Sequence, residues 1–242
     1  MKKKKILLVI PAYNEQDILE KNILRLRNFF KKNIKKYTWT IVLSDNASID
    51  NTYTVVEKLA KKYKDVKAAH MDRRAMSYAI KTNWLRNKAD IYMHMDADLS
   101  TDIKHIKDLL DALENGYDIA TASRVSKKSK TKRNIMRAII SRGLISTIKL
   151  FFSTDINDFQ CGFKAINSKV RNKIIPKMKA VQVGFMSTEM LVVAHKKGYK
   201  IKEIPVVWKD TRKSKSPIFR GILDALYNII KIRISYSLGK YD

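Results

Sequence analysis

Short apolar runs alternate with longer amphipathic stretches through the first half of the chain. Each run is too short for a buried helix and most are rich in β-branched residues, which favours strands at residues 6–10, 38–43, 66–70, 91–95 and 119–122. Between these runs, apolar side chains recur with helical spacing, most clearly over residues 15–32 and 51–62. This order predicts an α/β fold with a mostly parallel sheet whose strands are joined by helical crossovers.

Two segments in the second half are strongly apolar and also basic. NIMRAIISRGLISTIKLFF covers residues 134–152, and PIFRGILDALYNIIKIRISY covers residues 217–236. Both are typical of amphipathic helices in the headgroup layer of a membrane, although they could also pack on each other or pair in a homodimer. No stretch of about 18 uncharged apolar residues occurs, so no transmembrane helix is expected. We expect one domain over residues 1–216, with the interfacial helix inserted at 134–152, and a membrane-surface helix over 217–242.

The chain is strongly basic. Among its 242 residues, 50 are Lys or Arg and 23 are Asp or Glu, which gives a formal net charge of +27. Such a charge concentrates polyanions, so nucleic acid, an anionic membrane and phosphorylated substrates are the candidate partners. A hydrophobic content of 45% is enough for a folded core and disfavours a disordered chain. The single cysteine, Cys161, excludes an internal disulfide and a cysteine-built zinc site.

Acidic and polar side chains gather where the expected strands end. Ligands of α/β sheets bind in the crevice beyond these carboxyl ends. Asp96 and Asp98 occupy alternate positions after the fourth strand, so both carboxylates can point the same way and bind Mg²⁺ or Mn²⁺ together with a substrate diphosphate. An isolated pair of acids is more often a solvated turn or a helix cap. In a chain with 23 acids, however, their gathering at three strand ends favours the metal.

Three motifs at these strand ends resemble the nucleotide-sugar motifs of family 2 glycosyltransferases, whose members share the GT-A fold. They are PAYNE at residues 11–15, LSDNASIDNT at 43–52 and MDADLS at 95–100. The resemblance continues through ASR at 122–124, DFQCGFKAI at 158–166, FMSTEML at 185–191 and GYKIKEIPVVWKDTRKSKS at 198–216. The order is similar to that of the polyprenyl-phosphate sugar synthases, and DADLS followed by QCGFK resembles the dolichyl-phosphate glucosyltransferases more than the mannosyltransferases.

The resemblance assigns donor-binding roles to a set of residues. The nucleotide is expected to contact Pro11, Ala12, Tyr13, Asn14, Glu15, Asp45 and Asp96. Asp96 and Asp98 would hold the metal, while Ser100 stands where mannosyl members carry a glutamine ligand, which leaves the third protein ligand open. The donor sugar would contact Asp158, Gln160 and Glu189. A basic loop would close over the diphosphate through Arg212, Lys213 and Lys215. Glu189 could equally form a salt bridge that holds its helix, and the basic loop could be plain surface charge.

The acceptor side of the expected site is basic as well. By resemblance, the acceptor phosphate would bind Arg124, Arg137 and Ser141, and a guanidinium holds phosphate in a fixed geometry. Taken alone, Arg137 on an amphipathic helix would more often be a solvated charge. A phosphate monoester has a second pKa of about 6, so this acceptor is already ionised and needs no strong general base. The catalytic set would be Asp96, Asp98, Arg124 and Arg212.

These assignments imply an inverting, metal-dependent transfer of a hexose, with UDP-glucose favoured, to a polyprenyl or dolichyl phosphate. GDP-mannose is the alternative donor, and a sugar hydroxyl is the alternative acceptor, for which Asp158 would act as base. A basic nucleic-acid-binding protein is the alternative outside enzymes, but the aromatic residues do not interleave with the lysines as nucleic-acid-binding modules require. The expected location is peripheral, on the cytoplasmic face of an anionic membrane, and the oligomeric state stays open.

Two turns lack the glycines that members of this family commonly carry. Residues 75–79 read AMSYA in place of a glycine-rich turn, and Ala47 precedes Ser48 in place of a Gly-Ser pair. Glycine permits a positive φ and a close approach of the backbone. We therefore expect these loops to follow a different path, or the donor to lie further out.

Overall fold

The computed structural model describes residues 3–132, 135–179, 185–209 and 218–241. Its first five strands confirm the five predicted ones: β1 (Lys5–Ala12), β2 (Thr38–Asn46), β3 (Val66–Met71), β4 (Ile91–His94) and β5 (Ile119–Ser123). The two predicted helices are α1 (Gln16–Asn33) and α2 (Thr52–Lys62). This half also contains α3 (Met76–Arg86) and α4 (Ile106–Glu114), the latter preceded by a 3-10 turn at Ile103–His105.

The second half mixes short strands with helices. Its elements are β6 (Lys130–Lys132), α5 (Ile135–Phe152), β7 (Lys164–Asn167), α6 (Ser168–Lys173), a 3-10 turn (Ile175–Lys177), α7 (Met186–Lys196), β8 (Ile201–Pro205), β9 (Val207–Lys209) and α8 (Ile218–Ser237). The two apolar and basic segments therefore form helices, α5 and α8, as predicted.

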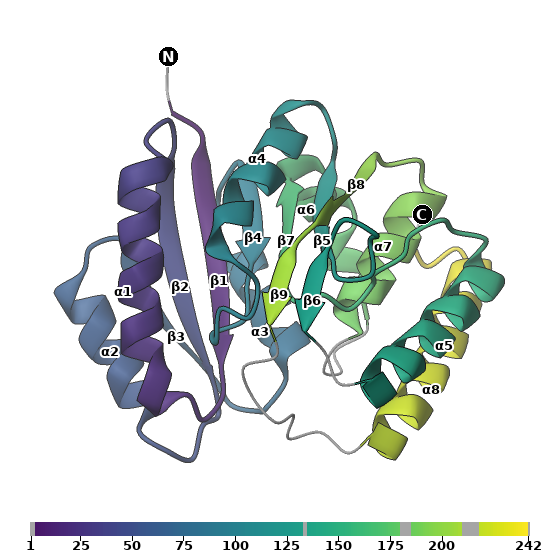
Figure 1. The fold of residues 1–242 in the computed structure, drawn as a ribbon, viewed down its shortest axis with the longest axis horizontal. Helices are drawn as coiled ribbons and strands as arrows, with labels where there is room; N and C mark the ends of the chain where they lie inside the picture. The colour runs from purple at the N-terminus through teal and green to yellow at the C-terminus, as the bar shows by residue number, and fades with distance from the viewer. Residues whose placement is uncertain (1–2, 133–134, 180–184, 210–217, 242) are drawn as a thin grey trace.

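Seven strands form one sheet in the order β3-β2-β1-β4-β7-β5-β8 (Figure 1). Neighbouring strands are parallel except that β7 runs antiparallel to both β4 and β5, so the predicted α/β fold with a mostly parallel sheet is confirmed. Strand β7 was not expected as a strand. Its insertion places the segment before it, residues 158–163, next to the loop that follows β4. The short strands β6 and β9 pair as a separate ribbon.

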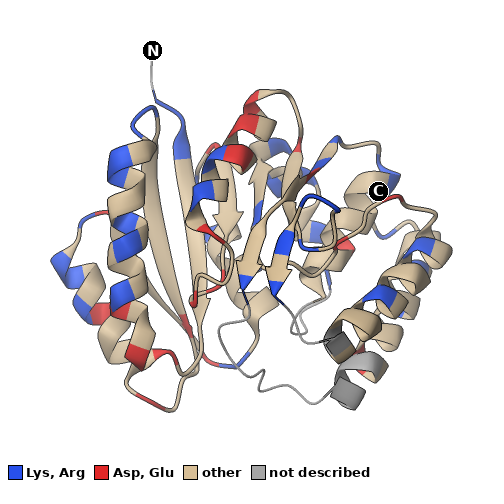
Figure 2. Cartoon of the chain, viewed as in Figure 1, with Lys and Arg blue, Asp and Glu red and all other residues tan. Residues whose placement is uncertain are grey.

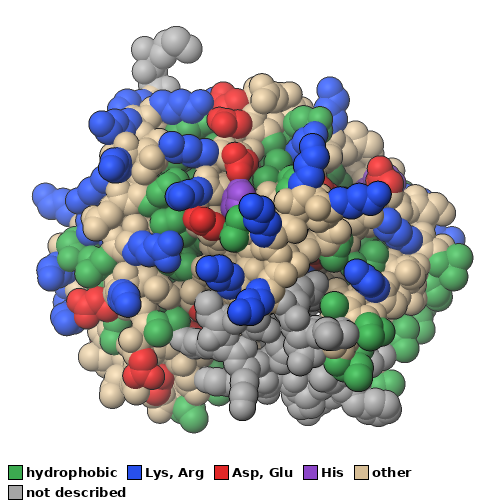
Figure 3. Space-filling view, in the orientation of Figure 1, with side chains coloured by type: hydrophobic (Ala, Val, Ile, Leu, Met, Phe, Trp, Pro, Cys, Tyr) green, Lys and Arg blue, Asp and Glu red, His purple; other side chains and the backbone are tan. Residues whose placement is uncertain are grey.

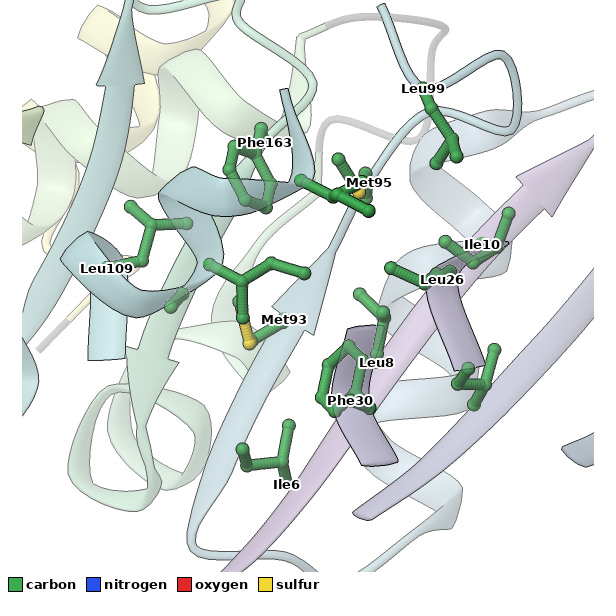
Figure 4. Packing of buried hydrophobic residues seen from close by; sticks show 14 of the residues in the cluster. Ile6, Leu8, Ile10, Leu26, Phe30, Met93, Met95, Leu99, Leu109 and Phe163 are labelled. Carbon is green, nitrogen blue, oxygen red and sulfur yellow. The ribbon is translucent and has the colours of Figure 1, made fainter. Parts of the chain in front are cut away.

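Alternate side chains of the central strands fill a core on each face of the sheet. On one face, Leu26 and Phe30 of α1 pack over Ile10 and Leu8 of β1 (Figure 4), and all four are fully buried. On the other face, Leu7 belongs to the cluster that surrounds Trp84 and α7. Helices cover both faces, as parallel sheets require, and this fixes the positions of the strand ends.

Helices α5 and α8 pack side by side at one edge of the molecule (Figure 1). Ile148 and Phe152 of α5 and Ala225 and Ile229 of α8 are buried, so these segments do pack on each other and on the core. Large apolar side chains remain exposed on the pair: Met136, Ile139, Leu150, Phe151, Leu223, Leu226, Tyr227, Ile230 and Ile234. None of the described helices is long and apolar enough to cross a bilayer.

Basic side chains are spread over the helices and over the β6–β9 ribbon, whereas acidic side chains are fewer (Figure 2). The space-filling view shows lysines and arginines over most of one face (Figure 3). Carboxylates at the strand ends therefore lie within a strongly positive molecule, which attracts anionic ligands toward them.

Candidate active site

The loop after β4 carries the two aspartates that the sequence singles out. Asp96 and Asp98 are partly exposed, while Ala97 between them is buried. Asp98 Oδ1 accepts a hydrogen bond from the backbone N–H of Ser100 at 3.0 Å, which fixes the turn. Burial and the neighbouring charge of Asp98 raise the pKa of Asp96 to about 7. The two negatively charged carboxylates repel each other unless one of them is protonated or a cation binds between them.

A glycine makes room for Asp96. A Cβ atom at position 162 would lie 2.2 Å from Asp96 Oδ2, closer than side chains tolerate. Gly162 belongs to the QCGF segment that β7 brings against the loop after β4. Two residues further on, the fully buried Lys164 donates to the carbonyl oxygen of Cys161, and its positive charge acts on Asp96. Sequence reasoning missed Gly162 and Lys164, because their roles depend on where β7 inserts.

Asp96 and Asp98 fit a hard, oxygen-binding divalent cation. Within the described ranges, no cluster of three or more His, Cys, Asp or Glu side chains could hold a metal by itself. Two carboxylates suffice for Mg²⁺ or Mn²⁺ when water and substrate phosphate supply the other ligands. The raised pKa of Asp96 points the same way, because a cation would offset both the burial of its negative charge and the repulsion from Asp98, which raise it.

Arg124, directly after β5, is held by Asp158. Its Nε and Nη2 atoms donate to the carboxylate at 2.8 and 2.9 Å, and its backbone N–H donates at 2.8 Å. The backbone N–H groups of Gln160 and Cys161 donate to the same carboxylate. Although burial alone would raise it, the pKa of Asp158 is lowered by the hydrogen bonds and charge of Arg124. With both oxygens occupied, Asp158 is not placed to act as a general base for a hydroxyl acceptor.

A small hollow joins one expected acceptor residue to two expected donor-sugar residues. Ser141 of α5 lines it together with Asp158 and Gln160, and Leu144 and Phe159 complete its wall. Ser141 is 17 residues before Asp158 in the sequence, and the packing of α5 brings it next to Asp158 and Gln160. The side chain of Arg137 and the residues Arg212, Lys213 and Lys215 lie outside the described part of the structure, so their roles stay predictions.

Hydrogen bonds join the PAYNE motif, at the end of β1, to the LSDNASIDNT motif, at the end of β2. The backbone N–H of Asn14 donates to Ser48 Oγ at 3.0 Å, and Asn14 Oδ1 accepts from the backbone of Ile49 at 3.0 Å. The backbone N–H of Glu15 donates to Thr52 Oγ1 at 2.7 Å. These polar loops are therefore held together by side-chain hydrogen bonds, as a pre-formed nucleotide site would be.

The turn after β2 keeps a left-handed backbone without glycine. Ala47 has φ of +56°, a conformation that costs a side-chain-bearing residue roughly 1–2 kcal/mol. The backbone here therefore takes the left-handed conformation that glycine favours, although the residue is alanine. The expectation that the loop follows a different path, or that the donor lies further out, stays a prediction. Ala75, in contrast, has extended backbone with φ of −150°, and α3 begins directly after it, so this position requires no glycine.

Asp45 and Glu189 are both buried and hydrogen-bonded within the protein. Asp45 Oδ2 lies 2.8 Å from Nδ1 of His70, a residue that sequence reasoning did not single out. Glu189 Oε1 accepts hydrogen bonds from Tyr241 Oη at 2.6 Å and from the backbone N–H of Lys179 at 2.9 Å. Burial and Glu189 raise the pKa of Tyr241. These contacts tie α7 to the residues after α8. They are the kind of contact expected if Glu189 holds its helix in place, with hydrogen bonds instead of the salt bridge.

Comparison with known proteins gives a consistent result. A model described as "Glycosyl transferase family 2" matches residues 7–175. The chain is 32% identical over 248 residues to dolichyl-phosphate beta-glucosyltransferase ALG5A of Trichomonas vaginalis, covering 97% of this chain and 74% of that protein. It is 28% identical over 218 residues to glycosyltransferase AglD of Haloferax volcanii, where it covers 89% of this chain but 35% of that protein. The chain thus spans about a third of AglD and about three quarters of ALG5A.

A solved structure extends the likeness to three dimensions. Glucosyl-3-phosphoglycerate synthase from Mycobacterium tuberculosis, in complex with Mn²⁺, UDP-glucose and glycerol 3-phosphate, matches with a TM-score of 0.67 at 12% identity. The match covers 96% of this chain and 79% of that chain. At this identity the likeness supports the fold, and it confirms the predicted GT-A arrangement.

Proposed function

Because the chain belongs to glycosyl transferase family 2, we propose that this glycosyltransferase moves glucose from UDP-glucose to a polyprenyl or dolichyl phosphate, with inversion at the anomeric carbon. The observation that carries the proposal is the meeting of Asp96, Asp98 and Arg124 at one edge of the sheet, where the charges of Asp98 and Arg124 both act on Asp96. Carboxylates there suit a cation with a diphosphate, and the arginine suits a second phosphate. The similarity to ALG5A, a dolichyl-phosphate beta-glucosyltransferase, supports glucose as the transferred sugar and dolichyl phosphate as the acceptor.

In the proposed reaction, an oxygen of the lipid phosphate bonds to the anomeric carbon as the bond from that carbon to UDP breaks. The attacking oxygen is already ionised, so no side chain has to remove a proton. This agrees with the contacts of Asp158, whose oxygens hold Arg124. A Mg²⁺ or Mn²⁺ ion held by Asp96 and Asp98 would neutralise the charge that develops on the leaving diphosphate.

Arg124 is suited to orient the acceptor phosphate. Asp158 fixes its guanidinium through Nε and Nη2, while Nη1 makes no hydrogen bond within the described residues. A guanidinium fixed in this way loses little conformational entropy when it binds a phosphate. Ser141 lies across the neighbouring hollow, and we assign it and Arg137 to the same phosphate. The basic residues Arg212, Lys213 and Lys215 are assigned to the donor diphosphate by resemblance.

The proposed acceptor carries a lipid tail, and the exposed apolar side chains of α5 and α8 are suited to its surroundings. Burying a half-exposed leucine or isoleucine is worth about 1 kcal/mol, and each basic residue near an anionic leaflet adds about 1 kcal/mol. The nine exposed apolar side chains that the structure describes on these helices are enough for reversible docking. We assign residues 134–152 and 217–242 to this surface, on the cytoplasmic face of the membrane.

The direct test is a transfer assay. Purified protein, Mg²⁺, a short-chain polyprenyl phosphate and labelled UDP-glucose are incubated, and the label in the organic phase is counted. We expect labelled lipid with UDP-glucose and much less with GDP-mannose. Asp98→Ala should abolish the transfer, whereas Asp111→Ala, which removes an exposed carboxylate of α4, should leave it intact. Label found only on a sugar hydroxyl, or greater transfer from GDP-mannose, would overturn the proposal.

A further inference from the structure

Asp45 offers one unused acceptor atom in a buried position. Its side chain is fully buried at the end of β2. Its Oδ2 atom lies 2.8 Å from His70 Nδ1 and 3.4 Å from the backbone nitrogen of Ser48. Within the described part of the chain, its Oδ1 atom has no hydrogen-bond partner. A buried carboxylate oxygen without a donor is costly, so this atom marks a place where an N–H group of a ligand fits.

The surroundings of Asp45 suit a flat heterocycle. In the sheet, Asp45 lies between Ala12 of β1 and His70 of β3. Tyr13 follows Ala12, and its ring packs against the guanidinium of Arg74 with 4.1 Å between the guanidinium carbon and the ring centroid. Aromatic rings and guanidinium planes are the surfaces on which nucleobases stack. Tyr13, next to the residue that pairs with Asp45, and Arg74, which packs on its ring, therefore offer surfaces on which a base could stack.

His70 occupies the second carboxylate oxygen of Asp45, Oδ2, with a hydrogen bond. A carboxylate can only accept hydrogen bonds, so the imidazole donates from Nδ1. The ring of Tyr53 packs against the imidazole with 4.9 Å between centroids, which holds its orientation. The carboxylate can therefore accept one hydrogen bond from a ligand through Oδ1, but not two through both oxygens.

We propose that His70 is a specificity-determining residue that restricts the donor to uridine nucleotides. The inference rests on the proposed function and on the expected contact of Asp45 with the nucleotide, which we assign to the base. Uracil presents one donor, N3–H, between two carbonyl groups, and Oδ1 alone satisfies it. Guanine presents two adjacent donors, N1–H and the 2-amino group, which together need both oxygens of a carboxylate. With Oδ2 taken by His70, one guanine donor is left buried without a partner, and sites of this kind reject such ligands strongly.

The test compares the binding of UDP and GDP by calorimetry in the presence of Mg²⁺, without acceptor, in the wild type and two variants. The wild type should bind UDP at least about tenfold more tightly than GDP. His70→Ala frees Oδ2, so the affinity for GDP should rise and the preference should fall severalfold. His70→Asn places an amide donor near the position of Nδ1 and should keep the preference. The side chain of His70 is 48% exposed, so both variants are expected to fold, which thermal melting verifies.

The possible outcomes distinguish a failure of this inference from a failure of the proposed function. An unchanged ratio of UDP to GDP affinity in His70→Ala, or an equal loss for both nucleotides, would overturn the role of His70 and leave the transferase reaction standing. Equal affinity of the wild type for both nucleotides would overturn it as well. Failure of the wild type to bind either nucleotide would overturn the inference and the proposed function together.

Discussion

Replacing Gly162 by alanine should disable the site with a limited effect on the fold. The added Cβ atom would lie 2.2 Å from Oδ2, 2.3 Å from Oδ1 and 2.5 Å from Cγ of Asp96, whereas real Cβ contacts stay beyond 3.0 Å. The carboxylate therefore has to retreat by roughly 0.8 Å. A displacement of about 1 Å can lower a catalysed rate about 100-fold, which equals about 2.7 kcal/mol of transition-state stabilisation. The crowding itself should cost about 1–3 kcal/mol of folding free energy.

The assay measures kcat/KM for the lipid product at several Mn²⁺ concentrations, together with Mn²⁺ binding by electron paramagnetic resonance. We expect a fall of about two orders of magnitude in kcat/KM and weaker Mn²⁺ binding. Gly143→Ala is the matched control, because nothing lies within 4 Å of its added Cβ and Ala favours the helix. If Gly162→Ala keeps wild-type activity and Mn²⁺ affinity, the placement of Asp96 under this loop is refuted.

Three further changes test other parts of the molecule. Asp158→Asn leaves the buried Arg124 without its counter-charge, so urea titrations should show about 3 kcal/mol less stability at pH 7. Because the pKa of Asp158 is lowered in the folded protein, the wild type should lose this advantage as the pH falls below about 4, and a difference that does not depend on pH would contradict the ion pair. Ala47→Gly removes the strain of a left-handed backbone at a side-chain-bearing residue. After the extra conformational entropy that glycine loses on folding is subtracted, Tm should rise by about 2 °C, whereas a lower Tm would argue against the strain. Ile230→Ser with Ile234→Ser should reduce flotation with anionic liposomes at unchanged Tm, since both side chains are exposed, and undiminished flotation would remove α8 from membrane docking.

Much of the first half of the fold follows from local patterns. Strands β1, β2, β4 and β5 are short and largely buried, the edge strand β3 is buried at both ends, and α1 and α2 carry apolar stripes, so local patterns are enough to find them. Strand β7 was missed because KAIN is four residues long and belongs to the sheet only through its pairing with β4 and β5. Such pairing joins residues far apart in the chain and leaves no local signal.

The candidate site, too, combines residues that can be found from the sequence with residues whose role depends on the fold. Asp96 and Asp98 are visible in the sequence, because carboxylates after an apolar strand are unusual in a chain so rich in lysine. The partners that position the site are not visible. Gly162 acts on Asp96 through the insertion of β7, and His70 reaches Asp45 across the sheet from a neighbouring strand. Arg124 and Asp158 were expected to bind separate ligands, and the structure pairs them, a contact between residues 34 positions apart.

The most direct measurement of the central claim is a crystal structure of the protein with UDP and Mn²⁺. We expect one Mn²⁺ ion bonded to a carboxylate oxygen of Asp98 and to the diphosphate, at about 2.1 Å from each, with Arg124 facing the same crevice. A diphosphate bound without the aspartates, or a metal bound elsewhere on the chain, would contradict the account.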